Sequence, residues 1–362
     1  MEQEQLAQIV ALRRTLHSCP EQAGCEAQTK ARLMAFLAAN TSLTLHDQGL
    51  WFYAAHREGE DLPGVAFRAD FDAVPTEEGA AHLCGHDGHA AALCGLALLL
   101  EGKKLGKNVF LLFQFGEENG QGGEACCALF DRERLDEVYG AHNLPGYPLG
   151  QILTRPGTMA CASCGVTVRY IGAPAHAAYP ETGRSVAAAV GSLLTELPGL
   201  ASPADYRGMV LCTVIGCRMG EKAFGVSAGT AEVWLTLRAA ENGDFRRLRQ
   251  RVTDRARALA DRDGLGCEIA LQDVFPATEN TPEAAEKVLS ACGGVLLPSP
   301  MRWSEDFGWY LQRRPGAFFG VGAGEDCPAL HTAEYVYPDE LLPITAGAFY
   351  RLAQAPLLRK DP

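Results

Sequence analysis

The stretch from Asn108 to Phe115 reads NVFLLFQF and is almost continuously apolar. An alternating pattern would indicate a strand with one wet face, whereas a continuous run is typical of a strand buried on both faces of a parallel sheet. The run ends in Gly116, Glu117 and Glu118. Open α/β sheets bind ligands at the carboxyl ends of their strands. We therefore predict an α/β fold with a mixed, mostly parallel sheet and a site at these glutamates.

Two further predicted strands carry polar residues in the same place. Val65–Phe71 carries Asp70 and Asp72 at its end, and Val138–Leu144 presents His142. Two aspartates at i and i+2 on a strand share one face, and Arg68 offers a simple neutralising partner for one of them. Because three strand ends recur in this way, we favour a functional role for Asp72.

The segment His82–His89 reads HLCGHDGH and lies between the first two of these strand ends. Cysteine and histidine are preferred ligands of zinc-like metals, and an aspartate can either bind a metal or orient a ligating histidine. Taken alone, the segment is also compatible with a polar loop. The neighbouring strand ends favour a metal site.

Helical spacing of apolar residues predicts helices at 5–17 and 25–39, and residues 90–100 are apolar on all sides, as in a buried helix. From residue 165 the predicted order is β-α-β-β-α-β, that of a ferredoxin-like unit. We therefore divide the chain into a first catalytic part, an inserted α+β module and a second catalytic part, with these boundaries: 1–164, 165–275 and 276–362.

Composition restricts the partners. The chain has 362 residues and a net charge of -12, which argues against nucleic acid or an anionic membrane as a partner. No apolar run has the length of a membrane span. The start is polar with a helical pattern, unlike a secretory signal, and the thirteen cysteines are then expected to be reduced thiols. These features predict a cytoplasmic protein.

Eight motifs now support a resemblance to the co-catalytic metal amidohydrolases that include aminoacylases, hippurate hydrolases and auxin–amino-acid conjugate hydrolases. In order along almost the whole chain they are RRTLHSCPE, RADFDAVP, HLCGHDGH, GEENGQGG, AHNLP, GAPAHAAYP, SEDFGWYL and the late Leu330-His331 pair. The resemblance implies a zinc-peptidase-like catalytic domain with an inserted lid and dimerisation domain.

The resemblance also implies roles for individual residues. Two divalent metal ions, zinc in the first place with manganese or cobalt as alternatives, would be held by Cys84, His86, Glu118, His142 and His331, with Cys84 bridging both ions. Glu117 would be the general base and acid, and Asp72 would orient a metal-bound histidine. His176 would reach the active site of a partner subunit and polarise the scissile carbonyl, and Arg238 would hold the substrate carboxylate.

The remaining residues of the His-rich segment, His82, Asp87 and His89, are expected to support the site rather than bind metal. Cys161 and Cys164 form a C-x-x-C pair. Such a pair can serve redox chemistry or bind zinc, but no second pair accompanies it, so we favour buried thiols.

The chain departs from the family pattern at Gly225, where relatives usually carry an asparagine in the lid, and at Pro174 and Trp303. These positions lie near the expected substrate pocket, while the expected ligands and base are all present. We therefore expect catalysis with an altered substrate range.

The leading hypothesis is a homodimeric, metal-dependent hydrolase of small N-acyl amino acids. Two metals roughly 3.5–4 Å apart can lower the pKa of water from 15.7 to about 7 and polarise an amide carbonyl. The alternatives are a dipeptidase or carboxypeptidase on the same site, a cysteine hydrolase with Cys84 as nucleophile, and a non-catalytic binding protein. Retention of Glu117 and of all expected ligands argues against the last of these.

Overall fold

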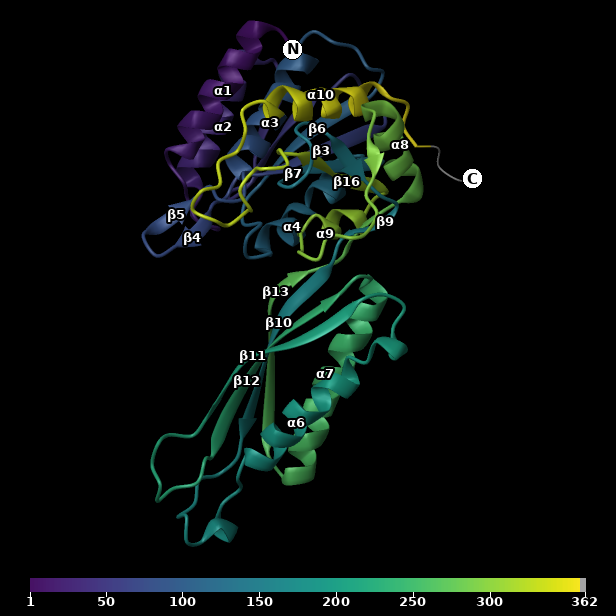
Figure 1. Ribbon diagram of the computed structural model, residues 1–362. Coiled ribbons are helices and arrows are strands. Elements are labelled where there is room, and N and C mark those ends of the chain that lie inside the picture. Colours follow the sequence, from purple (N-terminus) through teal and green to yellow (C-terminus); the bar gives the residue numbers. More distant parts are fainter. Residues whose placement is uncertain (359–362) are drawn as a thin grey trace. The chain divides into compact units, whose positions relative to one another are not determined.

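In the computed structural model, which describes residues 1–358, the apolar stretch at 108–114 is strand β6 of an eight-stranded sheet (Figure 1). In spatial order the strands are β1 (Thr44–Asp47), β2 (Phe52–His56), β6 (Asn108–Gln114), β3 (Gly64–Asp70), β7 (Glu137–Leu144), β16 (Gly316–Gly322), β8 (Ile152–Thr154) and β15 (Val295–Leu296). The neighbours β6, β3, β7 and β16 run parallel. All residues of these four strands are buried, as the continuous apolar run predicted for β6.

Helices flank this sheet. They are α1 (Gln3–His17), α2 (Ala27–Asn40), α3 (His86–Leu100), α4 (Gln121–Cys126), α5 (Leu129–Arg132), α8 (Pro282–Cys292), α9 (Gly308–Leu311) and α10 (Leu341–Gln354). Helix α3 packs on β3 and is itself covered by α1 and α10, which accounts for its apolar character on all sides. Two short pairs complete this part, β4 (Val74–Thr76) with β5 (Gly79–Ala81), and β9 (Gly157–Ala160) with β14 (Thr278–Asn280).

A second compact unit comprises Ala160–Ala277 and Met301–Glu305. Its elements are β10 (Ala162–Ile171), η1 (Pro180–Thr182), α6 (Ala187–Leu200), η2 (Pro203–Asp205), β11 (Val210–Met219), β12 (Thr230–Ala239), α7 (Asn242–Asp263) and β13 (Gly266–Phe275). The four strands form an antiparallel sheet in the order β11-β12-β10-β13. The β-α-β-β-α-β order is as predicted, and the fold class is confirmed.

Within the second unit, helices lie on one face of this smaller sheet. Helices α6 and α7 pack on it (Figure 1), and along β12 buried residues such as Val233 and Leu235 alternate with the more exposed Glu232 and Trp234. This alternation is the strand pattern expected for one dry and one wet face.

The first unit consists of Met1–Met159, Thr278–Pro300 and the residues from Asp306 on. Within residues 1–358, no helix has both the length and the apolar character required to cross a membrane.

The register of the larger sheet brings the polar strand ends together. Asp70, the last residue of β3, pairs with Gln114, the last residue of β6. Asp72 follows Asp70 by two residues and Gly116 follows Gln114 by two residues. Both segments therefore leave the sheet at the same edge. On the other side β3 pairs with β7, which carries His142 near its carboxyl end.

Candidate metal centre

The segment expected to hold the metals lies at the start of helix α3. The helix begins at His86, earlier than the predicted start at Ala90, because Gly85 adopts a left-handed conformation with φ of 95° at the N-cap position. A Cβ atom at Gly85 would lie 2.6 Å from Asn143 Oδ1 and 2.9 Å from the hydroxyl oxygen of Tyr335. Only glycine meets both demands, and it places Cys84 and His86 on either side of the turn.

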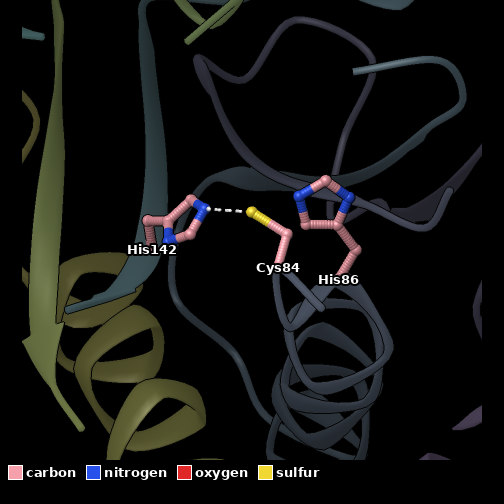
Figure 2. A group of neighbouring side chains, drawn as sticks. All are labelled: Cys84, His86 and His142. Carbon is pink, nitrogen blue, oxygen red and sulfur yellow. Dashed lines mark hydrogen bonds between the residues drawn. The ribbon is translucent and has the colours of Figure 1, made fainter. Parts of the chain in front are cut away.

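Cys84, His86 and His142 form the first group of potential ligands, with one donor atom from each within 4.8 Å of the others (Figure 2). Cys84 Sγ lies 3.4 Å from His142 Nε2, and Figure 2 shows the sulfur between the two imidazole rings. His142 Nδ1 donates to the carbonyl oxygen of Asn143 at 2.8 Å. This bond leaves the Nε2 lone pair directed at the sulfur, the tautomer that can bind a metal.

Cys84, Glu118 and His331 form a second group that satisfies the same 4.8 Å criterion. His331 has a left-handed φ of 62°, uncommon for a residue other than glycine, and its N–H donates to the carbonyl oxygen of Leu83 at 2.8 Å. Its Nε2 atom lies 3.6 Å from Glu118 Oε1. The sulfur of Cys84 therefore belongs to both groups.

Asp72 connects members of the two groups. Its Oδ1 atom accepts a hydrogen bond from His86 Nδ1 at 3.0 Å, and its Oδ2 atom accepts the Glu118 N–H at 3.0 Å. Glu117 is buried, and its carboxylate lies with His86 and Glu118 in a further group within 4.8 Å. The structure thus brings together the five expected ligands, the expected base and the expected orienting aspartate.

The donor atoms fit divalent cations. His86 Nε2 and Glu118 Oε1 are buried without a hydrogen-bond partner in the described part of the chain, and they lie 3.8 Å apart. Burial holds the pKa of His142 well below its ordinary value, so this ring is neutral as a metal ligand must be. Burial lowers the pKa of His86, but the nearby Asp70, Cys84 and Asp72 outweigh this effect and hold it well above its usual range. The carboxylates of Asp70 and Asp72 would also attract a cation.

Cys84 itself is buried, and burial raises the pKa of its thiol well above the ordinary value, against the opposing effect of His86. A thiolate at this position requires positive charge beside it, which two metal ions would supply.

A buried network of polar side chains lies next to the potential ligands. Arg68 donates to Asp70 Oδ2 and to Asp306 Oδ1, each at 2.7 Å. Asp70 Oδ1 accepts from His89 Nδ1 at 2.6 Å, and His89 Nε2 lies 2.5 Å from Asn143 Oδ1. His89 therefore belongs to this network, and its ring also packs edge-on against that of His142, with ring centroids 4.6 Å apart. With Asp70 and His86 it forms another group of potential ligands within 4.8 Å.

The two remaining polar residues of the His82–His89 segment, Asp87 and His82, face helix α1. Asp87 Oδ2 contacts His17 Nδ1 at 2.9 Å and Arg13 Nη1 at 3.5 Å. His82 is buried with its ring 6.0 Å from that of His17.

His176 and Arg238 both belong to the second unit. His176 is exposed between β10 and η1, where its Nδ1 accepts the Ala178 N–H at 3.1 Å, so the ring proton resides on Nε2. The Arg238 guanidinium donates to the carbonyl oxygen of Arg302 at 2.7 Å and to Ser304 Oγ at 2.6 Å. The roles of both residues toward a substrate stay predictions.

Gly225 lies close to His176, because the backbone of 176–177 pairs with that of 225–226. The Ala177 N–H donates to the Gly225 carbonyl oxygen at 2.9 Å, and a Cβ atom at Gly225 would meet nothing within 4 Å. The absence of the usual asparagine therefore leaves open space in this unit.

Some residues around the site were not predicted. Asp306 accepts hydrogen bonds from Arg68, Gln114 and the Gly123 N–H, and Glu26 accepts one from the Gly116 N–H. Asp306 lies in the SEDFGWYL motif, a usable signal, whereas no motif or spacing marks Glu26 as part of the site. Cys161 and Cys164 are buried free thiols, as favoured above.

The model of peptidase family M20/M25/M40 matches residues 66–355. An N-acetyldiaminopimelate deacetylase from Lacticaseibacillus paracasei is 27% identical over 363 residues, which cover 92% of this chain and 94% of the relative. Among solved structures, a putative aminohydrolase from methicillin-resistant Staphylococcus aureus has a TM-score of 0.88 at 23% identity and covers 97% of this chain and 96% of its own. A dinuclear metal-binding peptidase of the M20 family from Bacillus subtilis has a TM-score of 0.80 at 21% identity, with 98% of each chain covered. These two structures have the same fold as this chain.

Proposed function

Because this chain belongs to peptidase family M20/M25/M40, whose members are hydrolases of amide bonds, we propose that it is a metal-dependent amidohydrolase of N-acyl amino acids. The products would be a carboxylate and a free amino acid. The observation that carries the proposal is the sulfur of Cys84, which belongs to two groups of potential ligands and so would be within reach of two ions. The name of the deacetylase relative supports an N-acylated amino acid as substrate.

Cys84, His86 and His142 would hold one ion, and Cys84, Glu118 and His331 the other. We expect zinc because the shared ligand is a thiolate, with manganese or cobalt as alternatives. When bound, the metals supply Lewis-acid polarisation of the amide carbonyl and acidification of water.

Glu117 moves the proton. Its buried carboxylate accepts a proton from the attacking water and passes it to the leaving amine, a role that contributes on the order of 10²–10⁴-fold. Asp72 holds the His86 ring and the Glu118 backbone in fixed orientations through its two oxygens. Pre-organised side chains of this kind lower the cost of reaching the transition state.

His176 stabilises the developing oxyanion in this proposal. The proton on its Nε2 is available to an acceptor because Nδ1 is occupied by the Ala178 N–H. A donor of this type is worth about 10²–10³-fold. Arg238 would bind the substrate carboxylate, for which it would exchange its present contacts with Arg302 and Ser304.

We further propose a homodimer through the second unit, with His176 acting in the partner's active site. Strand β11 lies at the edge of the small sheet and exposes Val214, Ile215 and Met219. An exposed apolar edge strand is a surface that proteins normally cover. We place the enzyme in the cytoplasm, since all thirteen cysteines are free thiols.

The test is a substrate panel combined with metal exchange. N-acetyldiaminopimelate, other N-acetyl and N-benzoyl amino acids and unblocked dipeptides would be incubated with the purified protein. We expect cleavage of an N-acyl amino acid, loss of activity with a chelator and recovery with Zn²⁺, Mn²⁺ or Co²⁺. Cleavage of dipeptides alone would establish a dipeptidase instead, and activity that survives chelation but not iodoacetamide would establish a cysteine hydrolase.

A further inference from the structure

The three-residue segment Gly116–Glu118 is held at both ends by buried carboxylates. Its first amide, the Gly116 N–H, donates to Glu26 Oε1 at 2.9 Å, and its last, the Glu118 N–H, donates to Asp72 Oδ2 at 3.0 Å. Glu117 lies between these two anchored amides. The direction of its side chain therefore depends on where the two carboxylates hold the backbone.

Gly116 is the point at which this segment leaves the sheet. It has a left-handed φ of 58° two residues after the end of β6, and its carbonyl oxygen accepts the Gly122 N–H at 3.0 Å. The chain therefore turns sharply at Gly116, and the hydrogen bond from Gly122 closes the turn. A bond to the Gly116 amide from outside the turn fixes the direction in which the next residue, Glu117, starts.

Glu26 is poorly explained as part of its own helix. It occupies the N-cap position of α2 but makes no side-chain capping bond there. Glu21 does this work instead, because its carboxylate accepts the N–H groups of Gln28 at 3.2 Å and Thr29 at 2.7 Å. The carboxyl group of Glu26 is thus available to Gly116.

The position of Glu26 is also costly. The residue is 3% exposed, and its Oε2 atom is buried without a hydrogen-bond partner among residues 1–358. Burial, assisted by the charge of Asp72 and opposed by backbone N–H groups, raises the pKa of this carboxyl to about 7. A buried ionisable group with a raised pKa beside a reaction centre is more typical of function than of stability.

We propose that Glu26 is a positioning residue that aims the general base Glu117 by holding the Gly116 amide. The proposal rests on the function proposed above, in which Glu117 transfers the proton. Glu26 itself does not touch the reacting atoms. It acts through the backbone of the turn, so its removal should change the rate of the chemical step and leave substrate binding and metal content in place.

The matched control is Glu21, which lies in the same segment. Its carboxylate accepts hydrogen bonds from backbone N–H groups of helix α2. We expect Glu26→Ala to lower kcat by about tenfold or more, since small misplacements of a catalytic group can cost up to about 10²-fold. KM and metal content should change less than about twofold. Glu26→Gln retains an oxygen acceptor for the Gly116 amide and should recover most of the rate. Glu21→Ala should lower Tm with little change in kcat.

Coupling to Glu117 separates a positioning role from a general loss of structure. If Glu26 acts through Glu117, the double variant Glu26→Ala/Glu117→Gln should be no slower than Glu117→Gln alone. Multiplicative losses in the double variant would overturn the proposal. So would a kcat unchanged in Glu26→Ala, or an equal loss of kcat in Glu21→Ala.

Hydrogen–deuterium exchange of peptides that span residues 114–120 needs no substrate and keeps this test apart from that of the proposed function. Exchange should accelerate in Glu26→Ala and stay near the wild-type rate in Glu26→Gln and Glu21→Ala. Unchanged exchange in Glu26→Ala refutes the hold on the turn even in an active enzyme. Accelerated exchange in a protein that cleaves no N-acyl amino acid supports the hold and refutes the proposed function alone.

Discussion

His86 Nδ1 lies 3.0 Å from Asp72 Oδ1, and the other oxygen of the same carboxylate accepts the Glu118 N–H. One aspartate therefore contacts a proposed ligand of each of the two proposed metals, through the side chain of His86 and through the backbone of Glu118. Removal of the Asp72 carboxylate should therefore weaken metal binding more than it destabilises the fold.

We expect Asp72→Ala to weaken metal binding by about 10–100-fold, the usual effect of removing a partner that orients a ligand. The measurement is competition with a chromophoric chelator, with Asp61→Ala as a control at an exposed position of the same unit. Equal metal affinity in Asp72→Ala and the wild type would show that the two hydrogen bonds do not matter for the ligands.

Glu117→Gln should retain both metals and lose turnover by about 10²–10⁴-fold, because an amide cannot accept the proton of water. Steady-state kinetics and metal analysis of the same preparation provide the check. Glu124→Gln, an exposed change seven residues further on, should behave as the wild type. If Glu117→Gln kept the wild-type rate, the assignment of the base would be wrong.

Much of this centre is predictable because it depends on local pattern and strand order. A continuous apolar run predicts a buried parallel strand, and parallel strands bring their carboxyl ends to one edge, so Asp72, Glu117 and His142 could be placed together from the sequence. The start of α3 at His86 was missed because it depends on the left-handed backbone of Gly85. The apolar pattern becomes visible only from Ala90 on.

Long-range polar partners could not be predicted in the same way. Arg68 and Asp306 are separated by 238 positions, yet a 2.7 Å hydrogen bond joins them. Glu26 and Gly116 are separated by 90 positions. Such pairs have no periodicity along the chain, and they form only once the packing of helices and loops has fixed the surroundings of each group.

His176→Ala should lower kcat by about 10²–10³-fold with metal content unchanged, if its Nε2 proton stabilises the oxyanion. Mixing this variant with Glu117→Gln under conditions of subunit exchange should restore activity, because a mixed dimer would contain one site with both residues intact. Size-exclusion chromatography with light scattering must show the dimer first. Without any recovery in the mixture, His176 does not act across subunits.

The raised pKa of Glu26 predicts a pH-dependent difference between the wild type and Glu26→Gln. The carboxyl titrates at about 7 in the folded protein against 4.5 as its ordinary value, so burial disfavours the ionised form. Below about pH 4.5 the carboxyl is protonated in both states and costs nothing. Between about 4.5 and 7 it ionises in the unfolded chain only, and the wild type loses stability as pH rises.

Glutamine never ionises, so Glu26→Gln should escape this loss. We expect its free energy of unfolding to exceed that of the wild type at pH 8 by about 1–3 kcal/mol, since one pKa unit corresponds to about 1.4 kcal/mol, and the gain should be absent near pH 4.5. Urea denaturation of both proteins at the two pH values measures the gain, and effects of pH common to both cancel in the comparison. A difference that is the same at both pH values would mean that Glu26 keeps an ordinary pKa in the folded protein.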